Sequence, residues 1–363
     1  MGDKNKLILE NVWKHYRKVE AIKGLNLKCR EGEFFSILGP SGAGKTSLLR
    51  MIAGVEPVTS GHIYINRVMI NDIPPEHRNV AMFFENYALY PHLTVFENIA
   101  SPLRAPLRAE KYTEKEIDKK VREIAELLGI ENFLQRKPAH LSGGQKQRVA
   151  LGRTLVRRPS ILLLDEPISH LDAKLRHRMR GELKRICEAL KVTVIYATPD
   201  YKEAMAMADR IAVINQGILQ QIGTPDEIFN HPANEFVADF VGEPPMNFVD
   251  GEIREKDRKM LLRSKGIEII LPEDISRLIS KERIKGKIKL GIRPMYVKVA
   301  KEPSADFYLP AEVYTIEPLG YVSILTGKVG EDLIQAFVSS EFKIEIGKKI
   351  WLRFEAERLI FFK

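Results

Sequence analysis

A glycine-rich segment at residues 39–46 constrains this chain more than any other part of its sequence. It reads Gly-Pro-Ser-Gly-Ala-Gly-Lys-Thr, which fits the pattern G-x-x-x-x-G-K-[ST], and it follows an apolar run at residues 34–38. A helical pattern that ends near Gly54 comes next. In this strand–loop–helix context, the backbone N–H groups of the loop and the positive end of the helix point at the same place. The sequence therefore predicts a site for a nucleoside triphosphate; the alternative is a glycine-rich turn that holds no ligand.

Residues 39–47 supply the predicted contacts to the nucleotide. Lys45 is expected to reach the β- and γ-phosphates, and the Thr46 hydroxyl is expected to bind Mg²⁺. The glycines allow the tight turn that aims backbone N–H groups at phosphate oxygens. The predicted nucleotide-binding residues of this segment are Gly39, Pro40, Ser41, Gly42, Ala43, Gly44, Lys45, Thr46 and Ser47.

Length, charge and cysteine usage narrow the class of protein. With 363 residues the chain is long enough for two domains, each with its own core. No apolar run approaches the roughly 20 residues that a membrane-spanning helix needs, and residues 1–6 carry no apolar signal-peptide segment. Cys29 and Cys187 show no metal-ligand or disulfide spacing, so we expect a reducing cytosolic setting. The net charge of +9 comes from scattered basic residues, which favours a solvated surface over contact with nucleic acid or an anionic membrane.

The alternation of apolar runs and helical patterns predicts an α/β domain over residues 1–235. Unbroken apolar runs at 161–164 and 192–197 are typical of strands buried on both faces. Between them, residues 173–190 predict a helix.

A largely helical insertion is predicted at about residues 94–158. Within it, Thr113 and Glu116 have the spacing of a capping box, and Gly129 offers a C-terminal stop. The apolar residues between these signals repeat at helical spacing, and we expect them to be packing residues: Ile117, Val121, Ile124 and Leu128.

Residues 236–363 predict a second, smaller domain that is mainly β. Prolines 244 and 245 mark the change, and helices are scarce beyond them. Strand-like stretches lie at 266–271, 288–299, 311–325, 333–338 and 350–362. We interpret them as the elements of an OB-like barrel.

Two acids end the apolar run at 161–164. In a protein with a phosphate-binding loop, Asp165 at the tip of the strand is expected to bind Mg²⁺ directly or through water. Glu166 would then lie beside the γ-phosphate, where it can act as the general base on the attacking water. The pattern is weak alone and strong beside the loop at 39–46.

A helix is predicted to begin at Ser142, because Ser142 and Gln145 have capping-box spacing. Gly143 and Gly144 stand in its first turn, where each glycine costs about 0.8–1.0 kcal/mol relative to alanine. Such glycines make sense if another group must approach the helix end closely, and the exposed N–H groups suit a γ-phosphate. The alternative is a helix cap softened by glycine.

These motifs together resemble the ATP-binding cassette of ABC transporters. The loop at 39–46 is followed in order by LSGGQ at 141–145, ILLLDEP at 161–167 and SHLD at 169–172. Further segments resemble the ATPase subunits of maltose-type sugar importers, so the resemblance covers the whole chain: 87–99, 242–247, 291–294 and 317–320. It implies a nucleotide-binding domain with a RecA-like core and a helical subdomain, followed by an OB-like regulatory or dimerisation domain.

The resemblance also implies partners and a mechanism. Two cassettes would close head to tail, each ATP lying between one subunit's phosphate loop and the other's LSGGQ, with Asp172 in the D-loop. Tyr16 matches the aromatic residue that stacks on adenine; a tyrosine that merely packs is the alternative. Two membrane permease subunits and, indirectly, a substrate-binding protein would complete an importer at the cytoplasmic face of the cell membrane. No nucleic acid is expected, because the aromatic and arginine pattern of OB grooves that bind it is not evident.

Two positions depart from the family pattern. Glu85 stands where the family has the Q-loop glutamine; it can still bind Mg²⁺ and take part in catalysis, but it adds negative charge beside the triphosphate. Pro199 replaces the switch histidine and offers no donor, not even a backbone N–H. His170, where asparagine is usual, is a milder change.

Since the LSGGQ half is intact, these departures suggest a heterodimer with a second, fuller ATPase. In that hypothesis the site that contains Glu85 and Pro199 is degenerate, and Ser142–Gln145 complete the partner's active site. The solute would be a carbohydrate or polyol, glycerol among them. The alternatives are a homodimeric sugar-importer ATPase and a nucleotide-binding regulatory subunit with little turnover.

Overall fold

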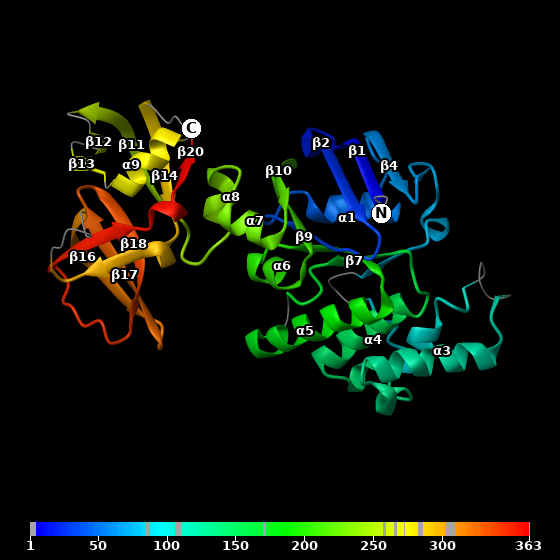
Figure 1. The fold of residues 1–363 in the computed structure, drawn as a ribbon. Helices are drawn as coiled ribbons and strands as arrows, with labels where there is room; N and C mark the ends of the chain where they lie inside the picture. The colour runs from blue at the N-terminus through cyan, green and yellow to red at the C-terminus, as the bar shows by residue number, and fades with distance from the viewer. Residues whose placement is uncertain are drawn as a thin grey trace. The chain divides into compact units, whose positions relative to one another are not determined.

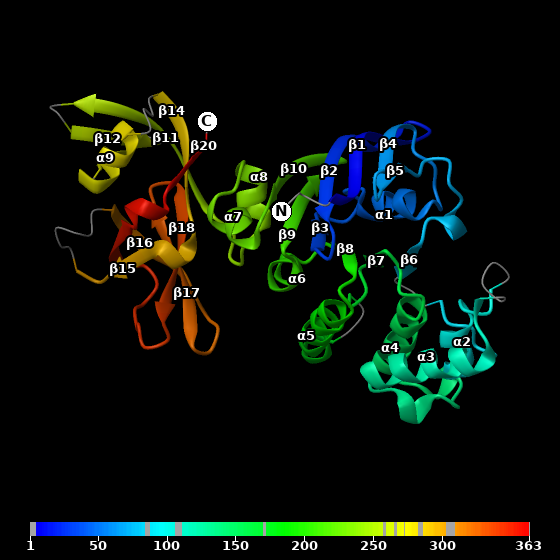
Figure 2. The ribbon, with the colours of Figure 1, turned by 45° about the vertical axis from the view of Figure 1, so that its right-hand side comes forward.

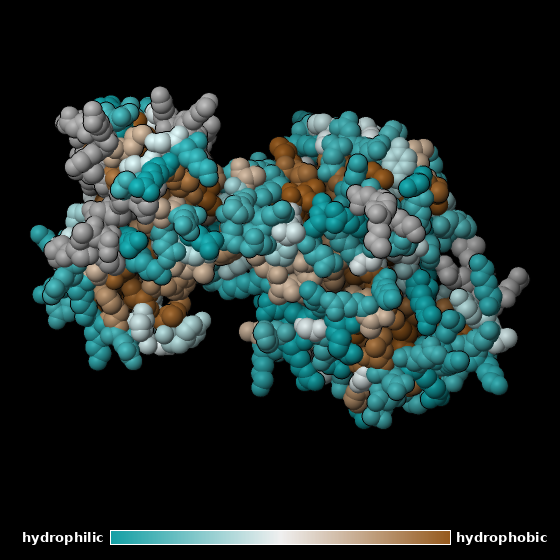
Figure 3. Space-filling model, in the orientation of Figure 1, coloured by the Kyte–Doolittle hydropathy of each residue, from teal (hydrophilic) through white to brown (hydrophobic). Residues whose placement is uncertain are grey.

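The computed structural model describes residues 5–83, 88–105, 111–169, 172–256, 259–264, 267–271, 273–281, 286–302 and 309–362. The chain divides into two compact units, Met1–Pro225 and Asp226–Lys363, each with a hydrophobic core. Among the described residues, no helix is long and apolar enough to cross a bilayer. The face drawn in Figure 3 is largely hydrophilic, with apolar side chains in separate patches.

A six-stranded sheet forms the centre of the first unit (Figure 1). Its order is β10-β9-β3-β8-β7-β6, and all neighbours are parallel except β10, which is antiparallel to β9. The strands are β3 (Phe34–Leu38), β6 (Val80–Phe83), β7 (Ile161–Asp165), β8 (Thr193–Thr198), β9 (Arg210–Asn215) and β10 (Ile218–Gly223). Every residue of β3, β7 and β8 is buried, as the unbroken apolar runs predict. Because parallel strands end at one edge, the segments that follow these three strands meet there.

A second, antiparallel sheet has the order β2-β1-β4-β5. Its strands are β1 (Asn5–Tyr16), β2 (Val19–Arg30), β4 (Ser60–Ile65) and β5 (Val68–Met69). Helix α1 (Lys45–Ala53) joins both sheets in one core: Leu48 and Ile52 pack in the same buried cluster as Leu9 of β1 and Ile37 of β3. This packing fixes the direction in which α1 leaves the glycine-rich loop.

The predicted helical insertion contains α2 (Val95–Ala100), α3 (Glu114–Leu127) and α4 (Gly143–Leu155), which lie together in Figure 2, apart from the strands of the antiparallel sheet. Thr94, Thr113 and Ser142 each form a complete capping box. The apolar positions predicted for α3 are buried, and Gly129 beyond its end has a φ of 60°. Two more helices follow, α5 (Ala173–Leu190), which has the predicted bounds, and α6 (Tyr201–Met207).

The second unit is mainly β, as predicted. Two five-stranded antiparallel sheets have the orders β13-β12-β11-β14-β20 and β15-β19-β16-β17-β18. The strands are β11 (Asn247–Lys256), β12 (Lys259–Ser264), β13 (Ile267–Ile270), β14 (Gly286–Ile292), β15 (Val297–Ala300), β16 (Leu309–Pro318), β17 (Val322–Val329), β18 (Asp332–Ser339), β19 (Lys349–Phe354) and β20 (Ile360–Phe362). Three helices complete it: α7 (Pro225–Asn230), α8 (Glu235–Phe240) and α9 (Glu273–Lys281).

Three of the predicted strand-like stretches are each two strands in the structure. The stretch at 311–325 is a hairpin that turns at residues 319–321, where Leu319 N–H donates to Val322 O at 2.8 Å. Those at 288–299 and 350–362 are interrupted by short 3₁₀ turns at Pro294–Tyr296 and Ala356–Arg358. Strands β11 and β12 were not predicted; in β11, the charged residues Asp250 and Glu252 separate the buried Val249 and Ile253.

Arg293 accounts for the packing of α7 and α8 with the second unit, whereas the sequence places the division after residue 235. Its buried guanidinium donates to Phe229 O at 2.8 Å, to Ala238 O at 3.0 Å and to Val241 O. The three carbonyls lie in or directly after α7 and α8, and Arg293 follows β14. The side chain thereby provides donors for carbonyls at the ends of both helices, where no backbone N–H of the helix itself is available to donate to them.

Candidate functional site

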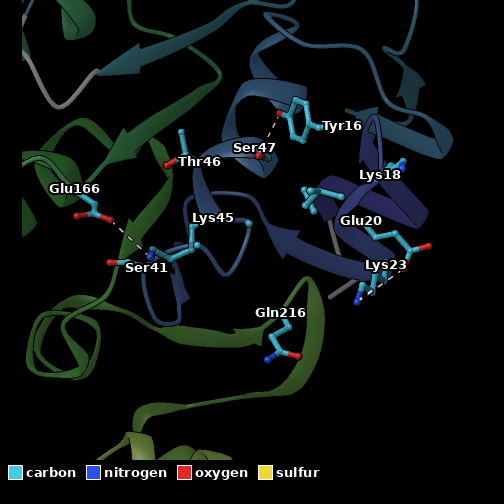
Figure 4. Close-up of a pocket in the computed structure, with 14 residues that line it drawn as sticks. Tyr16, Lys18, Glu20, Lys23, Ser41, Lys45, Thr46, Ser47, Glu166 and Gln216 are labelled. Atoms are coloured by element: carbon cyan, nitrogen blue, oxygen red, sulfur yellow. Dashed lines mark hydrogen bonds and ion pairs between the residues drawn. The ribbon is translucent and has the colours of Figure 1, made fainter.

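The carboxyl edge of the parallel strands opens on a cavity of about 860 Å³ (Figure 4). Residues of the glycine-rich loop and α1 line one side of it, and Glu166, which follows β7, lines another. Tyr16 at the end of β1 and Gln216 in the β9–β10 turn complete the wall. Of the predicted nucleotide-binding and catalytic residues, those that line this cavity are Tyr16, Ser41, Gly42, Gly44, Lys45, Thr46, Ser47 and Glu166.

Two glycines of the loop are required by their surroundings. A Cβ on Gly39 would lie 2.2 Å from Ile214 O, since the loop leaves β3 directly against β9. Gly44 has a φ of +101°, and a Cβ there would lie 2.5 Å from Ala21 O. Any larger residue would push the loop away from the strands that hold it.

Lys45 is the first residue of α1, and its side chain turns back into the loop. It is 4% exposed, and its Nζ donates to Gly39 O at 2.9 Å and to Pro40 O at 3.1 Å. Glu166 Oε1 lies 3.6 Å from the same Nζ. Burial lowers the pKa of Lys45, and the Glu166 carboxylate opposes that shift. The ammonium group is thus held where a phosphate group would meet it.

Thr46 and Asp165 form an oxygen pair at the foot of the cavity. The Thr46 hydroxyl donates to Asp165 Oδ1 at 3.1 Å, and Asp165 ends the buried strand β7. Hydroxyl and carboxylate oxygens are the ligands that Mg²⁺ prefers in proteins, so these residues fit the predicted metal. Glu85, the third predicted ligand, lies outside the described residues.

The backbone of Glu166 is in the left-handed region, with a φ of 45°. It is fixed there because its N–H donates to Ala197 O at 3.0 Å and its carbonyl accepts from the Ser169 hydroxyl at 2.9 Å. Non-glycine residues adopt this conformation rarely, and such strain is concentrated at functional sites. The strained turn directs the carboxylate towards Lys45 (Figure 4).

Tyr16 is 38% exposed and lines the cavity. Its hydroxyl lies 3.2 Å from Ser47 Oγ and also contacts the Glu56 carboxylate. The ring is therefore not part of the core, which argues against the interpretation that it only packs. Its role as a stacking residue for a nucleobase stays a prediction.

In the LSGGQ segment at the start of α4, Ser142 and Gly143 are exposed and Leu141 is buried, and none of its residues lines the cavity. Ser142 Oγ accepts from Gln145 N–H at 3.4 Å, and Gln145 Oε1 accepts from Ser142 N–H at 2.9 Å, as the capping box requires. A Cβ on Gly143 would meet nothing within 4 Å. Packing within this chain therefore does not explain the glycine at position 143. Gln147, which the sequence analysis missed, links this helix to the segment after β7, because its Nε2 donates to Pro167 O at 2.8 Å.

The remaining predicted positions lie on two loops. Asp172 is exposed directly before α5, and its carbonyl accepts from Arg176 N–H at 2.8 Å. Pro199 follows β8 beside the phosphate-binding loop, because the carbonyl of Thr198 accepts from Gly39 N–H at 3.4 Å. His170, like Glu85, lies outside the described residues.

A buried carboxylate that the sequence analysis did not identify holds the end of β8. Glu203 of α6 is 2% exposed, and its Oε2 accepts from the hydroxyls of Tyr196 and Thr198, each at 2.7 Å. Thr198 Oγ1 in turn accepts from Asp200 N–H at 3.0 Å. Burial raises the pKa of Glu203 although both hydroxyls favour the ionised form. The network fixes the residues on both sides of Pro199.

Glu203→Ala is expected to lower the free energy of unfolding by about 1–3 kcal/mol, because it leaves two buried hydroxyl donors without an acceptor. Glu203→Gln keeps an acceptor and removes the titrating group. Since the pKa of Glu203 is raised in the folded state, the parent loses stability relative to Glu203→Gln as the pH rises above about 4.5. Urea unfolding at several pH values measures both effects. If the difference in stability between Glu203→Gln and the parent does not change with pH, the pKa of Glu203 is not raised in the folded protein.

Comparisons with known proteins agree with this site. The ABC transporter family model matches residues 22–169, the MalK OB fold domain model matches 242–294 and the TOBE domain model matches 303–361. The trehalose/maltose import ATP-binding protein MalK of Thermococcus litoralis is 44% identical over 98% of this chain and 96% of its own length. The sn-glycerol-3-phosphate import ATP-binding protein UgpC of Pectobacterium atrosepticum is 42% identical over 95% of this chain and 94% of its own.

A solved structure extends the comparison to three dimensions. The dimeric structure of a post-hydrolysis state of the ATP-binding cassette MJ0796, bound to ADP and Pi, is 33% identical, with a TM-score of 0.54 over 60% of this chain and 98% of that one. The predicted fold class, a P-loop nucleotide-binding domain followed by an OB-like domain, is confirmed. The chain belongs to the family of ATP-binding subunits of ABC transporters.

Proposed function

We propose that this chain is the ATPase subunit of an importer for a sugar or a glycerol phosphate. The observation that carries the proposal is the meeting of Lys45, the Thr46–Asp165 pair and Glu166 around one cavity. The names of the relatives supply the solute class, since one is a trehalose/maltose import protein and the other an sn-glycerol-3-phosphate import protein. The predicted polyol solute, glycerol, is close to the second of these in chemistry.

The cavity's own residues support ATP as the ligand and hydrolysis as the reaction. Lys45 is placed to bind the β- and γ-phosphates, together with the backbone N–H groups of residues 41–46. Thr46 and Asp165 would hold Mg²⁺, which would neutralise part of the negative charge of the phosphates. Glu166 is placed to orient a water against the γ-phosphate and to accept its proton.

The exposed Ser142–Gly143 turn of the LSGGQ segment supports a site shared between two chains. Its first-turn glycine, Gly143, has open space around it, and the segment lies outside the cavity of its own chain. A head-to-tail pair would place each Ser142–Gln145 turn on the other chain's nucleotide, where the helix N-terminus favours a phosphate. MJ0796, the solved relative, is dimeric. The further partners in this proposal are two membrane permease subunits, which place the chain at the cytoplasmic face of the membrane, and a substrate-binding protein that acts through them.

Pro199 supports the finer proposal that the chain's own site hydrolyses ATP slowly and pairs with a second, different ATPase. It lies beside the phosphate-binding loop and offers no donor to a γ-phosphate. The relatives lend the heterodimer no support, and two copies of this chain are the alternative. Measuring the molecular mass of the purified chain in the presence of ATP separates the two. The heterodimer requires that this chain alone stays monomeric and that it dimerises only with a second, different cassette.

Cellular uptake tests the function and the solute together. Cells that carry Lys45→Ala in place of the parent chain should lose ATP-driven uptake of the transported solute, because the buried ammonium that meets the phosphates is gone. Radiolabelled maltose, trehalose and glycerol 3-phosphate identify that solute, and Lys6→Met is the matched control for the loss of one lysine. Uptake of all three solutes that is unchanged by Lys45→Ala would overturn the proposal.

A further inference from the structure

The Tyr16 ring is fixed at its outer end. Its hydroxyl lies 3.2 Å from Ser47 Oγ (Figure 4). The same hydroxyl also contacts the Glu56 carboxylate. Without such contacts, a tyrosine at the mouth of a cavity could rotate about its side-chain torsions. Here two polar groups, Ser47 in α1 and Glu56 in the bend after it, fix the position of the ring.

Lys14 covers one side of the same ring. Its Nζ lies 4.8 Å from the ring centroid, donates to Pro57 O at 2.7 Å and lies 3.6 Å from Glu56 Oε2. Its side chain is only 8% exposed, and neither Lys14 nor Glu56 lines the cavity. One side of the ring therefore carries a buried cation, and Tyr16 presents its remaining surface to the cavity.

Glu56 connects this aromatic wall to the phosphate-binding loop. Besides Tyr16 and Lys14 it pairs with Arg50 Nη1 at 3.2 Å, and its N–H donates to Arg50 O at 3.3 Å. It lies shortly after the end of α1 at Ala53, and α1 begins with Lys45; Ser47 lies in the first turn of the same helix. The ring is thus held at a fixed distance from the loop by two contacts, one to Ser47 near the start of α1 and one to Glu56 beyond its end.

We propose that Lys14 and Glu56 are positioning residues that hold Tyr16 as a one-sided stacking platform for the nucleobase of the bound nucleotide. The inference rests on the proposed function, because it requires that the cavity binds a nucleoside triphosphate. Because the ring is already held in place before binding, the entropy cost of ordering its side chain is not added when the base binds. Stacking of a base on an aromatic side chain corresponds to about 5- to 150-fold in affinity.

The test compares ATP with inorganic tripolyphosphate, which carries phosphates without a base, by calorimetry on the full chain with Mg²⁺. Tyr16→Ala should raise the Kd of ATP by about 5- to 150-fold. Lys14→Met and Glu56→Ala should raise it by about 2- to 10-fold, as expected for one cation–π contact or one hydrogen bond. All three should leave the Kd of tripolyphosphate within about twofold, and Glu56→Gln should recover most of the ATP affinity because it keeps an acceptor for the hydroxyl.

Lys6→Met is the matched control, because Lys6 is also on β1 and pairs with Glu31 away from the cavity. Thermal unfolding checks that each variant is folded. Equal weakening of ATP and tripolyphosphate by Lys14→Met and Glu56→Ala would mean a structural role only and would overturn the inference, as would unchanged affinity for ATP in both of these variants. A parent chain that binds neither ligand refutes the proposed function itself and the inference with it.

Discussion

Replacement of Glu166 by glutamine is expected to lower kcat for ATP hydrolysis by about 10²- to 10⁴-fold while ATP still binds. Glutamine keeps the size of the side chain and an oxygen for Lys45, which lies 3.6 Å from the carboxylate. It cannot accept the proton of an attacking water at neutral pH. The loss should therefore fall on the chemical step, and ATP bound between two chains should persist.

Single-turnover hydrolysis and a nucleotide-binding assay, run on the same preparation, measure the two parts of this expectation. Glu31→Gln provides a matched control, because that carboxylate is exposed and pairs with Lys6 outside the site. A parent-like rate in Glu166→Gln would assign the base to another residue. A loss of ATP affinity as large as the loss of rate would instead make Glu166 a binding residue.

The double change Pro199→His with Glu85→Gln is expected to raise kcat of the purified chain by up to about 10²-fold, the size of effect that one well-placed donor to a developing charge has. The imidazole would supply a donor beside the phosphate-binding loop, where Thr198 O already accepts from Gly39 N–H. Glutamine at position 85 would remove the negative charge that the family pattern predicts beside the triphosphate.

Pro199→Ala with Glu85→Gln is the matched control for this gain. It restores the backbone N–H and the freedom of φ without adding a side-chain donor. If the alanine variant turns over as fast as the histidine variant, the imidazole is not the cause. A parent chain that alone already hydrolyses ATP at the rate of an intact cassette would end the degenerate-site proposal.

Features set by neighbouring residues could be predicted from the sequence. Helix α5 has the predicted bounds, and the capping boxes at Thr113 and Ser142 are complete. Such signals are local, because the two residues of a capping box are only three positions apart in the sequence. The order of the motifs also predicts which residues meet at the carboxyl edge, because parallel strands share that edge.

Features that depend on distant residues could not be predicted. The hydrogen bonds from Arg293 to the carbonyls of Ala238 and Val241 need the tertiary structure, because no short-range pattern marks them. The same holds for Glu203, whose hydroxyl partner Tyr196 is on another element. Glu56 is a further case: in the sequence it is one acid among many, and only the fold brings it to Tyr16.

The position of Lys45 has a consequence for the thermodynamics of nucleotide binding. Its ammonium already holds two carbonyls of the loop, so the loop keeps its shape through a bond within the chain. An incoming triphosphate exchanges one set of partners for another and does not have to fold the loop around itself. The binding enthalpy should then be small for so many polar contacts. The affinity should come mainly from the low entropy cost of binding, because the loop is already ordered in the folded chain.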